Sequence, residues 1–423
     1  MHACAVNAYR NTKKAFLTNH FNYDGWAAVG GTGWAFNDVL PFFNRLETDE
    51  RYGAQPYHGD AGPIPIYRAP ISLWGAMDHT LAEAALDRGY PWAPDHNAPG
   101  ALGVSPYAIN NRDGVRVSTN DAYIEPSRRR NNLSIIGDAR VDKVIFAGER
   151  AAGVRVLHSG AWQEFRARNV LLCAGAVHSP AILLRSGIGP AAHLRELGCA
   201  VRADLPVGEQ FQDRPLAAFM FALHDHAVPP PGFRHTNCCV RFSSGIANAG
   251  PGDMMMVAMN GLGDGIGRPL RTADSPAMFG LLGVWVNQCF SRGQLRLKSL
   301  DPLCEPDIEE NMLDDASDLT RMRDGVRRLI DMTQHPAARR VGKVITSGID
   351  LETDTQVDQW VLANAGDAQH ATSTCRMGNP ADATTVVDPE CRVAGVEGLR
   401  VIDAAIMPSL VRANTHLTTV MIA

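Results

Sequence analysis

The sequence lacks the features that mark secreted, membrane-spanning and nucleic-acid-binding proteins. Its nine cysteines are scattered, odd in number and free of any C-x-x-C pair, which argues against a disulfide framework or a zinc site. No apolar run approaches the length of a membrane span, and residues 1–16 lack the apolar core of a signal peptide. The net charge of −5 is not the basic excess of a nucleic-acid-binding protein. We therefore expect a cytoplasmic protein with no transmembrane segment and no nucleic-acid partner.

A glycine motif is also missing. No G-x-G-x-x-G follows a predicted strand: GLGDGIG (261–267) has its glycines at the wrong spacing, and SGIGPAA (186–192) lacks the third. This motif is the usual cradle for a dinucleotide pyrophosphate, because its backbone N–H groups point at the anion from a helix N-terminus. A search for motifs alone would therefore class the chain as a protein that binds no nucleotide.

The features that are present indicate an enzyme of two or three domains that contains both α-helices and β-strands. The chain has 423 residues, of which 45% are hydrophobic. After Arg130, the runs LSIIG, VDKVIFA and AAGVRVLH predict a β-meander. Further β-type runs fill 216–287, and amphipathic helices are predicted over 314–334 and 353–365.

The stretch NVLLCAGA (169–176) is a continuous apolar run, typical of a strand buried on both faces. A helix is predicted directly after it. Ser179 is the expected N-cap, Pro180 the first helical residue and Gly187 the stop signal.

The stretch GDAQHATSTCRMG (366–378) holds the most informative histidine. Taken alone, His370 could be a surface residue, a metal ligand beside Cys375 or a catalytic base. Metal binding lacks a set of four ligands. Near the other end of the chain, Asn414 begins a predicted helix and could be a plain N-cap.

The stretch GAVHSPAILLRSGIG (175–189) resembles the second signature of the glucose–methanol–choline (GMC) flavoprotein oxidoreductases. The matching positions are Gly175, Ala176, Ser179, Pro180, Ile182, Leu183, Ser186, Gly187, Ile188 and Gly189. Other stretches similar to the family follow in family order, including YHGDAGPIPI (57–66), LPVGEQFQDRP (205–215) and VVDPECRVAGVEGLRVIDAAIMP (386–408). In LPVGEQFQDRP, Pro206 replaces a family glycine and Arg214 replaces a family histidine.

The resemblance implies an α/β fold (α and β mixed) with an FAD-binding, Rossmann-like domain built from discontinuous segments. It also implies a substrate domain built on a mostly antiparallel sheet. The implied divisions are a remnant of the first FAD signature in 1–20, FAD-covering and substrate-domain segments in 21–130, an FAD-binding segment in 131–215, the substrate-binding domain with the catalytic histidine loop in 216–380, and a C-terminal FAD-binding segment in 381–423.

The two ends depart from the family pattern. Family members begin with a βαβ unit that carries G-x-G-x-x-G, whereas this chain opens at CAVN, which resembles the end of the first signature with Asn7 at its last position. The stop at Ala423 falls inside the family's final helix. The resemblance therefore predicts a fragment with an incomplete FAD domain. We expect weak FAD binding, because nothing in the sequence replaces the turn that cradles the pyrophosphate.

The resemblance also gives His370 a role. In the family a histidine precedes Gly-Thr-x-x-Met-Gly and faces the flavin, and HATSTCRMG is similar, with Ser373 in place of the glycine. Asn414 occupies the second catalytic position of the family. When an alcohol is oxidised, its hydroxyl proton leaves as hydride moves to flavin N5, and a neutral imidazole suits the proton acceptor. An amide can hold the substrate oxygen in place.

The implied function is FAD-dependent oxidation of a small-molecule alcohol to an aldehyde or ketone, with His370 as base and no metal. The electron acceptor that reoxidises the flavin stays open. The FAD contacts implied by the family are Asn7, Val141, Ala174, Asp403, Ala404, Asn414 and Thr415. Strand packing for Val141 and Ala174, and loop capping for Asp403, remain alternatives. Two other functions also remain: a flavin-binding cyanohydrin lyase on the same scaffold, and a non-catalytic remnant without FAD.

Overall fold

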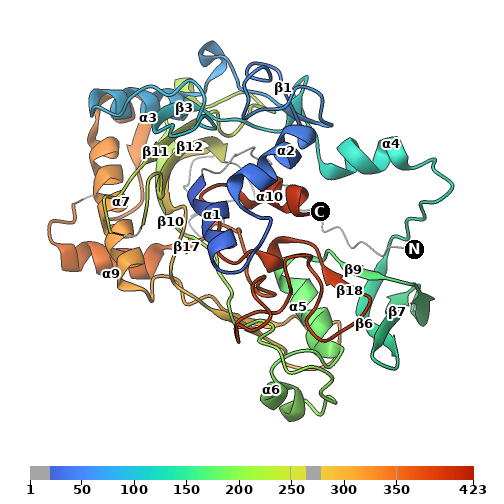
Figure 1. Cartoon of the computed structure of the whole chain (residues 1–423). Helices are drawn as coiled ribbons and strands as arrows, with labels where there is room; N and C mark the ends of the chain where they lie inside the picture. Colours follow the sequence, from blue (N-terminus) through green and yellow to red (C-terminus); the bar gives the residue numbers. More distant parts are fainter. Residues whose placement is uncertain (1–19, 248, 263–277, 349) are drawn as a thin grey trace.

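The computed structural model describes residues 20–247, 249–262, 278–348 and 350–423. A large sheet, with helices α3, α7 and α9 on its outer side, forms one half of the molecule (Figure 1). Small sheets around α5 form the other half, and α1, α2 and α10 lie between the two. The site described below lies where these halves meet.

The large sheet is antiparallel throughout, as the sequence predicts for the substrate domain. Its strand order is β16-β10-β13-β12-β11-β3, and β17 also pairs with β10. The strands are β3 (Gly103–Pro106), β10 (Pro215–Leu223), β11 (Cys238–Phe242), β12 (Met254–Leu262), β13 (Phe279–Val286), β16 (Gly342–Val344) and β17 (Gly366–Asp367).

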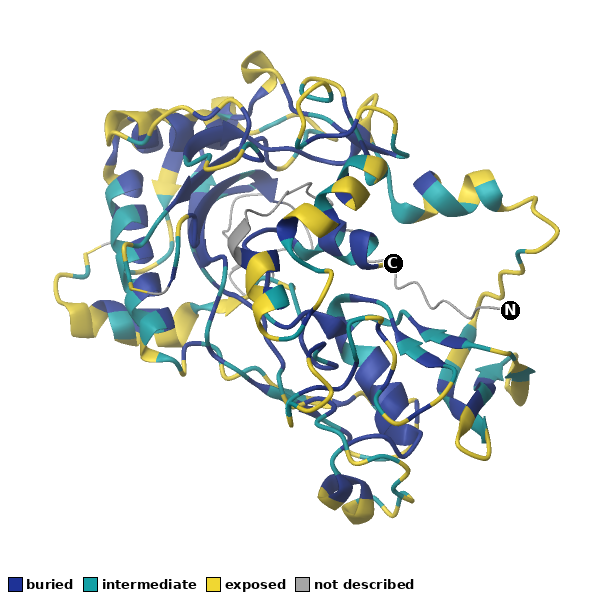
Figure 2. Ribbon diagram, viewed as in Figure 1, coloured by how far each residue is buried: buried dark blue, intermediate teal, exposed yellow. Residues whose placement is uncertain are grey.

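The two faces of this sheet belong to different cores, because successive side chains of a strand point to opposite faces. On the outer face, Val240, Met256 and Val284 pack in one core with α3 (Ala76–Asp87), α7 (Ala316–Gln334) and α9 (Asp354–Asn364). On the inner face, Cys239, Met255, Val257 and Trp285 share a second core with Tyr107 and Ala413. Figure 2 shows the strands buried and the outward sides of the covering helices exposed.

A two-stranded parallel sheet forms the centre of the other half. Strands β9 (Val170–Leu172) and β18 (Leu399–Val401) pair in the register Val170↔Leu399. Each strand runs into a helical segment, α5 (Gly175–Arg185) after β9 and η5 (Ala404–Ile406) after β18. Because the carboxyl ends of parallel strands meet at one edge, residues 173–175 and 402–404 are brought together.

The predicted meander is present, but one of its strands was wrongly placed. Its strands are β6 (Ala139–Ala147), β7 (Arg150–His158) and β8 (Ala161–Arg166), paired in the order β6-β7-β8. The run LSIIG (133–137) forms no strand, because it has no neighbour to pair with and lies exposed or half-buried.

Helix α5 begins before its predicted start. The sequence places Pro180 at the first helical position, whereas the helix begins at Gly175. A proline inside a helix leaves the carbonyl four residues earlier without its N–H donor. Here that carbonyl is on Ala176, and the Thr374 hydroxyl donates to it at 2.7 Å. A side chain from a distant loop thus allows the helix to continue through proline. The predicted stop is confirmed, since Gly187 follows the helix with φ +80°.

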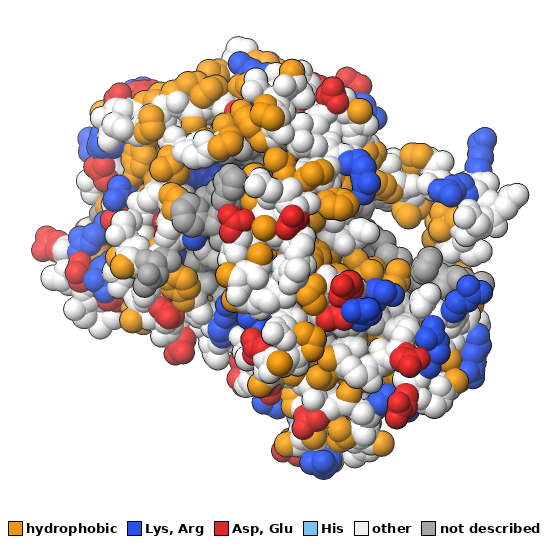
Figure 3. Space-filling view, in the orientation of Figure 1, with side chains coloured by type: hydrophobic (Ala, Val, Ile, Leu, Met, Phe, Trp, Pro, Cys, Tyr) orange, Lys and Arg blue, Asp and Glu red, His pale blue; other side chains and the backbone are white. Residues whose placement is uncertain are grey.

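The remaining elements are short. They are α1 (His20–Ala28), α2 (Phe36–Leu46), β1 (Glu47–Asp49), β2 (Ile64–Ile66), η1 (Ile71–Leu73), β4 (Asn111–Arg112), β5 (Val115–Arg116), η2 (Asn120–Ile124), α4 (Glu125–Ser127), α6 (Ala191–Glu196), η3 (Asp225–Ala227), β14 (Gln294–Arg296), β15 (Asp307–Glu309), α8 (Pro336–Val341) and α10 (Thr415–Ile422). Among the helices of the described residues, none has the length and apolar character needed to cross a membrane. On the face shown in Figure 3, basic and acidic side chains are intermixed.

Candidate active site

His370 and Asn414 lie side by side, although 44 residues separate them in the sequence. The distance between Asn414 Nδ2 and His370 Nε2 is 2.9 Å. His370 is half-buried in the loop that follows β17, and Asn414 is the buried N-cap of α10. The structure therefore brings together the two residues that the sequence predicts as catalytic.

A tyrosine fixes the orientation of the Asn414 amide. The Tyr107 hydroxyl donates to Asn414 Oδ1 at 2.9 Å, and burial raises the pKa of this hydroxyl well above its usual range, so that it keeps its proton. Since Oδ1 accepts from Tyr107, the amide nitrogen faces His370 and donates to Nε2. Nε2 accepts this N–H with its lone pair, so the neutral ring carries its proton on Nδ1. Sequence reasoning missed Tyr107, which belongs to no motif.

A buried carboxylate holds the backbone of His370. The His370 N–H donates to Asp213 Oδ1 at 2.9 Å and to Oδ2 at 2.8 Å. Burial, together with the nearby charge of Asp367, raises the pKa of Asp213 to about 7, although hydrogen bonds from the backbone N–H groups of His370 and Arg214 lower it. Asp213 was also missed, although it lies in the family-like stretch LPVGEQFQDRP.

The predicted cofactor residues Ala174, Asp403 and Ala404 meet at the carboxyl ends of β9 and β18. The Asp403 carboxylate is buried and accepts from Gly175 N at 2.8 Å, from Ser179 Oγ at 2.6 Å and from Ala405 N at 2.8 Å. Asp403 thus caps the loop and joins the two strand ends. The half-buried Ala174 and Ala404 lie next to it in the chain.

The turn at Gly175 leaves room for a ligand. Gly175 has φ +81°, and a side chain built on it would meet no atom within 4 Å. Ligands of parallel α/β sheets bind beyond the carboxyl ends of the strands, and α10, which begins at Thr415, packs against η5 at the same edge. Helix N-termini favour anionic groups. The residues of this edge therefore fit an extended anionic cofactor such as FAD.

Two predicted cofactor residues do not join this edge. Val141 lies in β6, and its carbonyl faces Arg185 Nη2 at 3.5 Å, at the opposite end of α5 from Gly175. The 11 residues of α5 separate the two ends by about 15 Å. Asn7 lies outside the described residues.

Backbone hydrogen bonds hold the His370 loop against the segment that follows β18. In the His370 loop, Cys375 N donates to Ala405 O at 2.8 Å and Met377 N to Ile406 O at 2.8 Å. These bonds pair the loop with the segment after β18. The stretch HATSTCRMG thus runs beside the segment that follows β18, and its first residue, His370, lies beside Asn414.

Comparison with known proteins gives a consistent result. Two protein-family models described as GMC oxidoreductase match the chain, one over residues 6–216 and the other over residues 289–423. The chain is 36% identical over 422 residues to the 5-(hydroxymethyl)furfural oxidase of Methylovorus sp. (strain MP688), covering 95% of this chain and 77% of that protein. It is 34% identical over 439 residues to the oxygen-dependent choline dehydrogenase of Ectopseudomonas mendocina (strain ymp), covering 96% and 75%.

A solved structure agrees with the fold. The crystal structure of pyridoxine 4-oxidase from Mesorbium loti superimposes with a TM-score of 0.87 at 26% identity, covering 97% of this chain and 80% of that one. The family models, the relatives and the fold lead to one conclusion. The chain belongs to the GMC oxidoreductase family.

Proposed function

We propose that the chain oxidises the CH–OH group of a small alcohol to an aldehyde or ketone with FAD as cofactor, and that His370 is the proton acceptor. The observation that carries the proposal is the 2.9 Å contact between Asn414 Nδ2 and His370 Nε2. Without substrate, the amide N–H donates to the lone pair of Nε2. A substrate hydroxyl that takes the place of this bond can accept from Nδ2 and donate to Nε2, which keeps its oxygen in place while its proton leaves.

FAD supplies the hydride acceptor when it is bound. His370 Nε2 takes the hydroxyl proton as the C–H hydrogen leaves with its electron pair, and the C–O bond becomes a carbonyl. Asn414 Nδ2 donates to the substrate oxygen, and Tyr107 keeps the amide in the orientation that allows this. Ala174, Asp403, Ala404 and Thr415 would hold the cofactor at the strand ends, and Val141 would contact it at the far end of α5.

The substrate class rests on the relatives. They are a 5-(hydroxymethyl)furfural oxidase, a choline dehydrogenase and a pyridoxine 4-oxidase. All three names refer to a small molecule that carries a CH–OH group, and two of these molecules carry it on an aromatic ring. We therefore propose a small alcohol, with an aromatic alcohol as the first choice.

The test uses the purified chain with FAD in excess, because the sequence predicts weak binding. Bound flavin is quantified by titration, and the chain is then mixed without oxygen with 5-hydroxymethylfurfural, choline or pyridoxine. Bleaching of the visible flavin band, together with an equivalent amount of aldehyde, supports the proposal. Bound flavin that stays oxidised with all three alcohols, while a cyanohydrin is cleaved, would support the lyase instead. Failure to bind FAD at any concentration would support the non-catalytic remnant.

A further inference from the structure

We propose that Arg214 is a positioning residue, whose guanidinium fixes the backbone that carries Asn414 and thereby holds Asn414 Nδ2 against His370 Nε2. This inference rests on the proposed function, because the pair it positions is the proposed catalytic pair. Arg214 occupies the position at which the sequence departs from the family's histidine. Its side chain is completely buried.

The contacts of Arg214 converge on the segment just before α10. Its Nη2 atom donates to the carbonyl of Val411 at 3.0 Å and to that of Ala413 at 2.7 Å. Ala413 immediately precedes Asn414, so the shorter bond fixes the peptide from which the Asn414 side chain departs. The guanidinium therefore acts on the residue next to Asn414.

The other end of the guanidinium is anchored to the large sheet. Nη1 donates to Asn287 Oδ1 at 3.3 Å, and Asn287 follows directly after β13. The same amide is held on both sides, since Trp285 Nε1 donates to its Oδ1 at 2.8 Å and its Nδ2 donates to Gly252 O at 3.0 Å. Arg214 thus links the large sheet to the N-terminus of α10 by hydrogen bonds at both ends.

Residues next to Arg214 in the sequence hold the loop that carries His370. Asp213 accepts the backbone N–H of His370, and the carbonyl of Arg214 accepts from Ala368 N at 3.1 Å. The backbones of Gln212 and Thr372 exchange hydrogen bonds of 3.2 and 2.9 Å. One buried stretch of three residues, 212–214, therefore ties the His370 loop and the Asn414 segment to the same backbone.

Arginine is suited to this task by its shape. Its planar guanidinium carries five N–H donors in a fixed fork, whereas lysine carries its donors on one flexible point charge. One arginine can therefore donate to two carbonyls and one amide oxygen at the same time. Burial lowers the pKa of Arg214 to about 10, so the group is still charged at neutral pH. Removing it would release two carbonyls next to Asn414 inside a packed core.

The first test reads the geometry without the cofactor. In protein labelled with ¹⁵N-histidine, the His370 ring is assigned by its absence in His370→Gln. In the native chain we expect the Nδ1–H tautomer when the ring is neutral, because Nε2 accepts from Asn414. In Arg214→Gln we expect this bias to be reduced or lost, and in Arg214→Lys to be intermediate. Since Lys keeps the buried charge, that variant gives the reading if Arg214→Gln does not fold.

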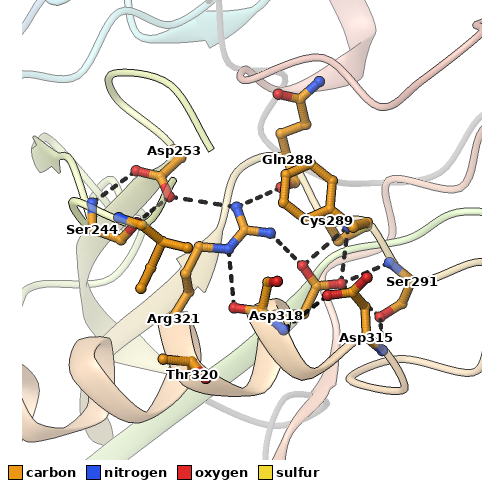
Figure 4. A network of polar contacts seen from close by, with 12 residues as sticks. Ser244, Asp253, Gln288, Cys289, Ser291, Asp315, Asp318, Thr320 and Arg321 are labelled. Atoms are coloured by element: carbon orange, nitrogen blue, oxygen red, sulfur yellow. Dashed lines mark hydrogen bonds and ion pairs between the residues drawn. The ribbon is translucent and has the colours of Figure 1, made fainter. Parts of the chain in front are cut away.

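A matched control is available in a second buried arginine. Arg68 donates to Asp49 Oδ2 at 2.6 Å and to Asp95 Oδ1 at 2.7 Å, and these partners lie in β1 and in the loop before β3. Arg68→Gln should lower stability and leave the His370 tautomer unchanged. Arg321, in the polar network of Figure 4, is less suitable, because its partner Gln288 also accepts from Arg412 Nε at 2.8 Å.

The second test measures flavin reduction by alcohol in the FAD-loaded chain. We expect Arg214→Gln to slow reduction about tenfold to a hundredfold, because a small misplacement of a catalytic group has effects of this size. The apparent substrate affinity should change much less than the rate. A native tautomer in Arg214→Gln or Arg214→Lys would overturn the inference, even if stability or rate fell. If the tautomer changed while His370→Ala reduced the flavin normally, positioning would stand and the proposed function would fail.

Discussion

Two histidines in this molecule, the buried His58 and the half-buried His370, are both held by hydrogen bonds, yet their partners differ. His58 Nδ1 lies 2.6 Å from Glu47 Oε1, and Nε2 lies 2.9 Å from Asp95 Oδ2. Burial opposes the charged ring, but the hydrogen bonds and charges of Asp95 and Glu47 outweigh it and raise the pKa of His58 to about 9. With both nitrogens engaged by carboxylates, this ring carries a structural charge.

His370 has the opposite partner. Asn414 offers an N–H donor, and a nitrogen that accepts from an amide must present a lone pair. The carboxylate that contacts His370, that of Asp213, binds the backbone N–H of this residue. The comparison teaches that the protonation of a histidine depends on its partners. Two carboxylates keep the His58 ring positively charged, whereas an amide donor favours the neutral His370 ring, the form that the proposed base requires.

The largest effect should come from removing the acceptor. We expect His370→Ala to slow flavin reduction by alcohol by about 10²–10⁴-fold, the usual contribution of a positioned general base, while FAD stays bound. Stopped-flow measurement of the flavin band checks this. His226→Ala, which removes an exposed histidine on η3, serves as control and should reduce at the native rate. Equal rates for the two variants would contradict the assignment.

Removing the charged ring of His58 should lower the stability of the protein. His58→Ala leaves Glu47 and Asp95 buried without the charge between them, and breaking a buried ion pair in this way costs about 3–5 kcal/mol. Denaturation by urea measures the loss. The flavin reduction rate of the folded fraction should stay native, and His370→Ala should cost much less stability. A His58→Ala variant as stable as the native chain would contradict the structural role of His58.

The pH dependence of stability should separate the two regions. Because the pKa of His58 is raised, its ring stabilises the folded state fully at pH values below 6.5, the ordinary pKa of histidine. This stabilisation is lost as the pH rises to about 9. The raised pKa of Asp213 means that its contribution is complete below 3.8 and is lost as the pH rises to about 7. Relative to the native chain, His58→Gln should flatten only the upper window and Asp213→Asn only the lower. Urea midpoints at several pH values measure this, and a single shared window would contradict it.

The smallest effect should come from a neutral hydrogen bond that holds the His370 loop. Thr374→Val removes the hydroxyl that donates to Ala176 O and should cost about 1–2 kcal/mol of stability. Pro180→Ala restores an N–H that can donate to the same carbonyl, so Thr374→Val should cost less in that background. A double-mutant cycle in urea measures the difference. Strictly additive effects would show that the hydroxyl does not replace the missing N–H.

The sequence predicts the parts of the site that lie within motifs. The family resemblance of HATSTCRMG and of the C-terminal helix points to His370 and Asn414. The same resemblance implies the antiparallel sheet, and the runs over 216–287 indicate its strands. Tyr107 and Asp213 could not be predicted, because their roles depend on contacts with residues far along the chain. No local periodicity records such contacts.

The predicted start of α5 failed for the same reason. The proline rule is local, whereas the donor that allows the helix to pass through Pro180 is Thr374, from a loop almost two hundred residues away. LSIIG failed because a strand needs a neighbour, and hydrophobic pattern alone does not supply one. Both errors concern tertiary partners.

The central claim, that His370 is the proton acceptor, is tested most directly by chemical rescue. The His370→Ala chain is loaded with FAD and mixed anaerobically with a reactive alcohol, and flavin reduction is followed with imidazole added at several pH values. The account predicts that the rate rises with the concentration of neutral imidazole and does not respond to imidazolium. A His370→Ala chain that reduces its flavin at the native rate without imidazole would contradict it.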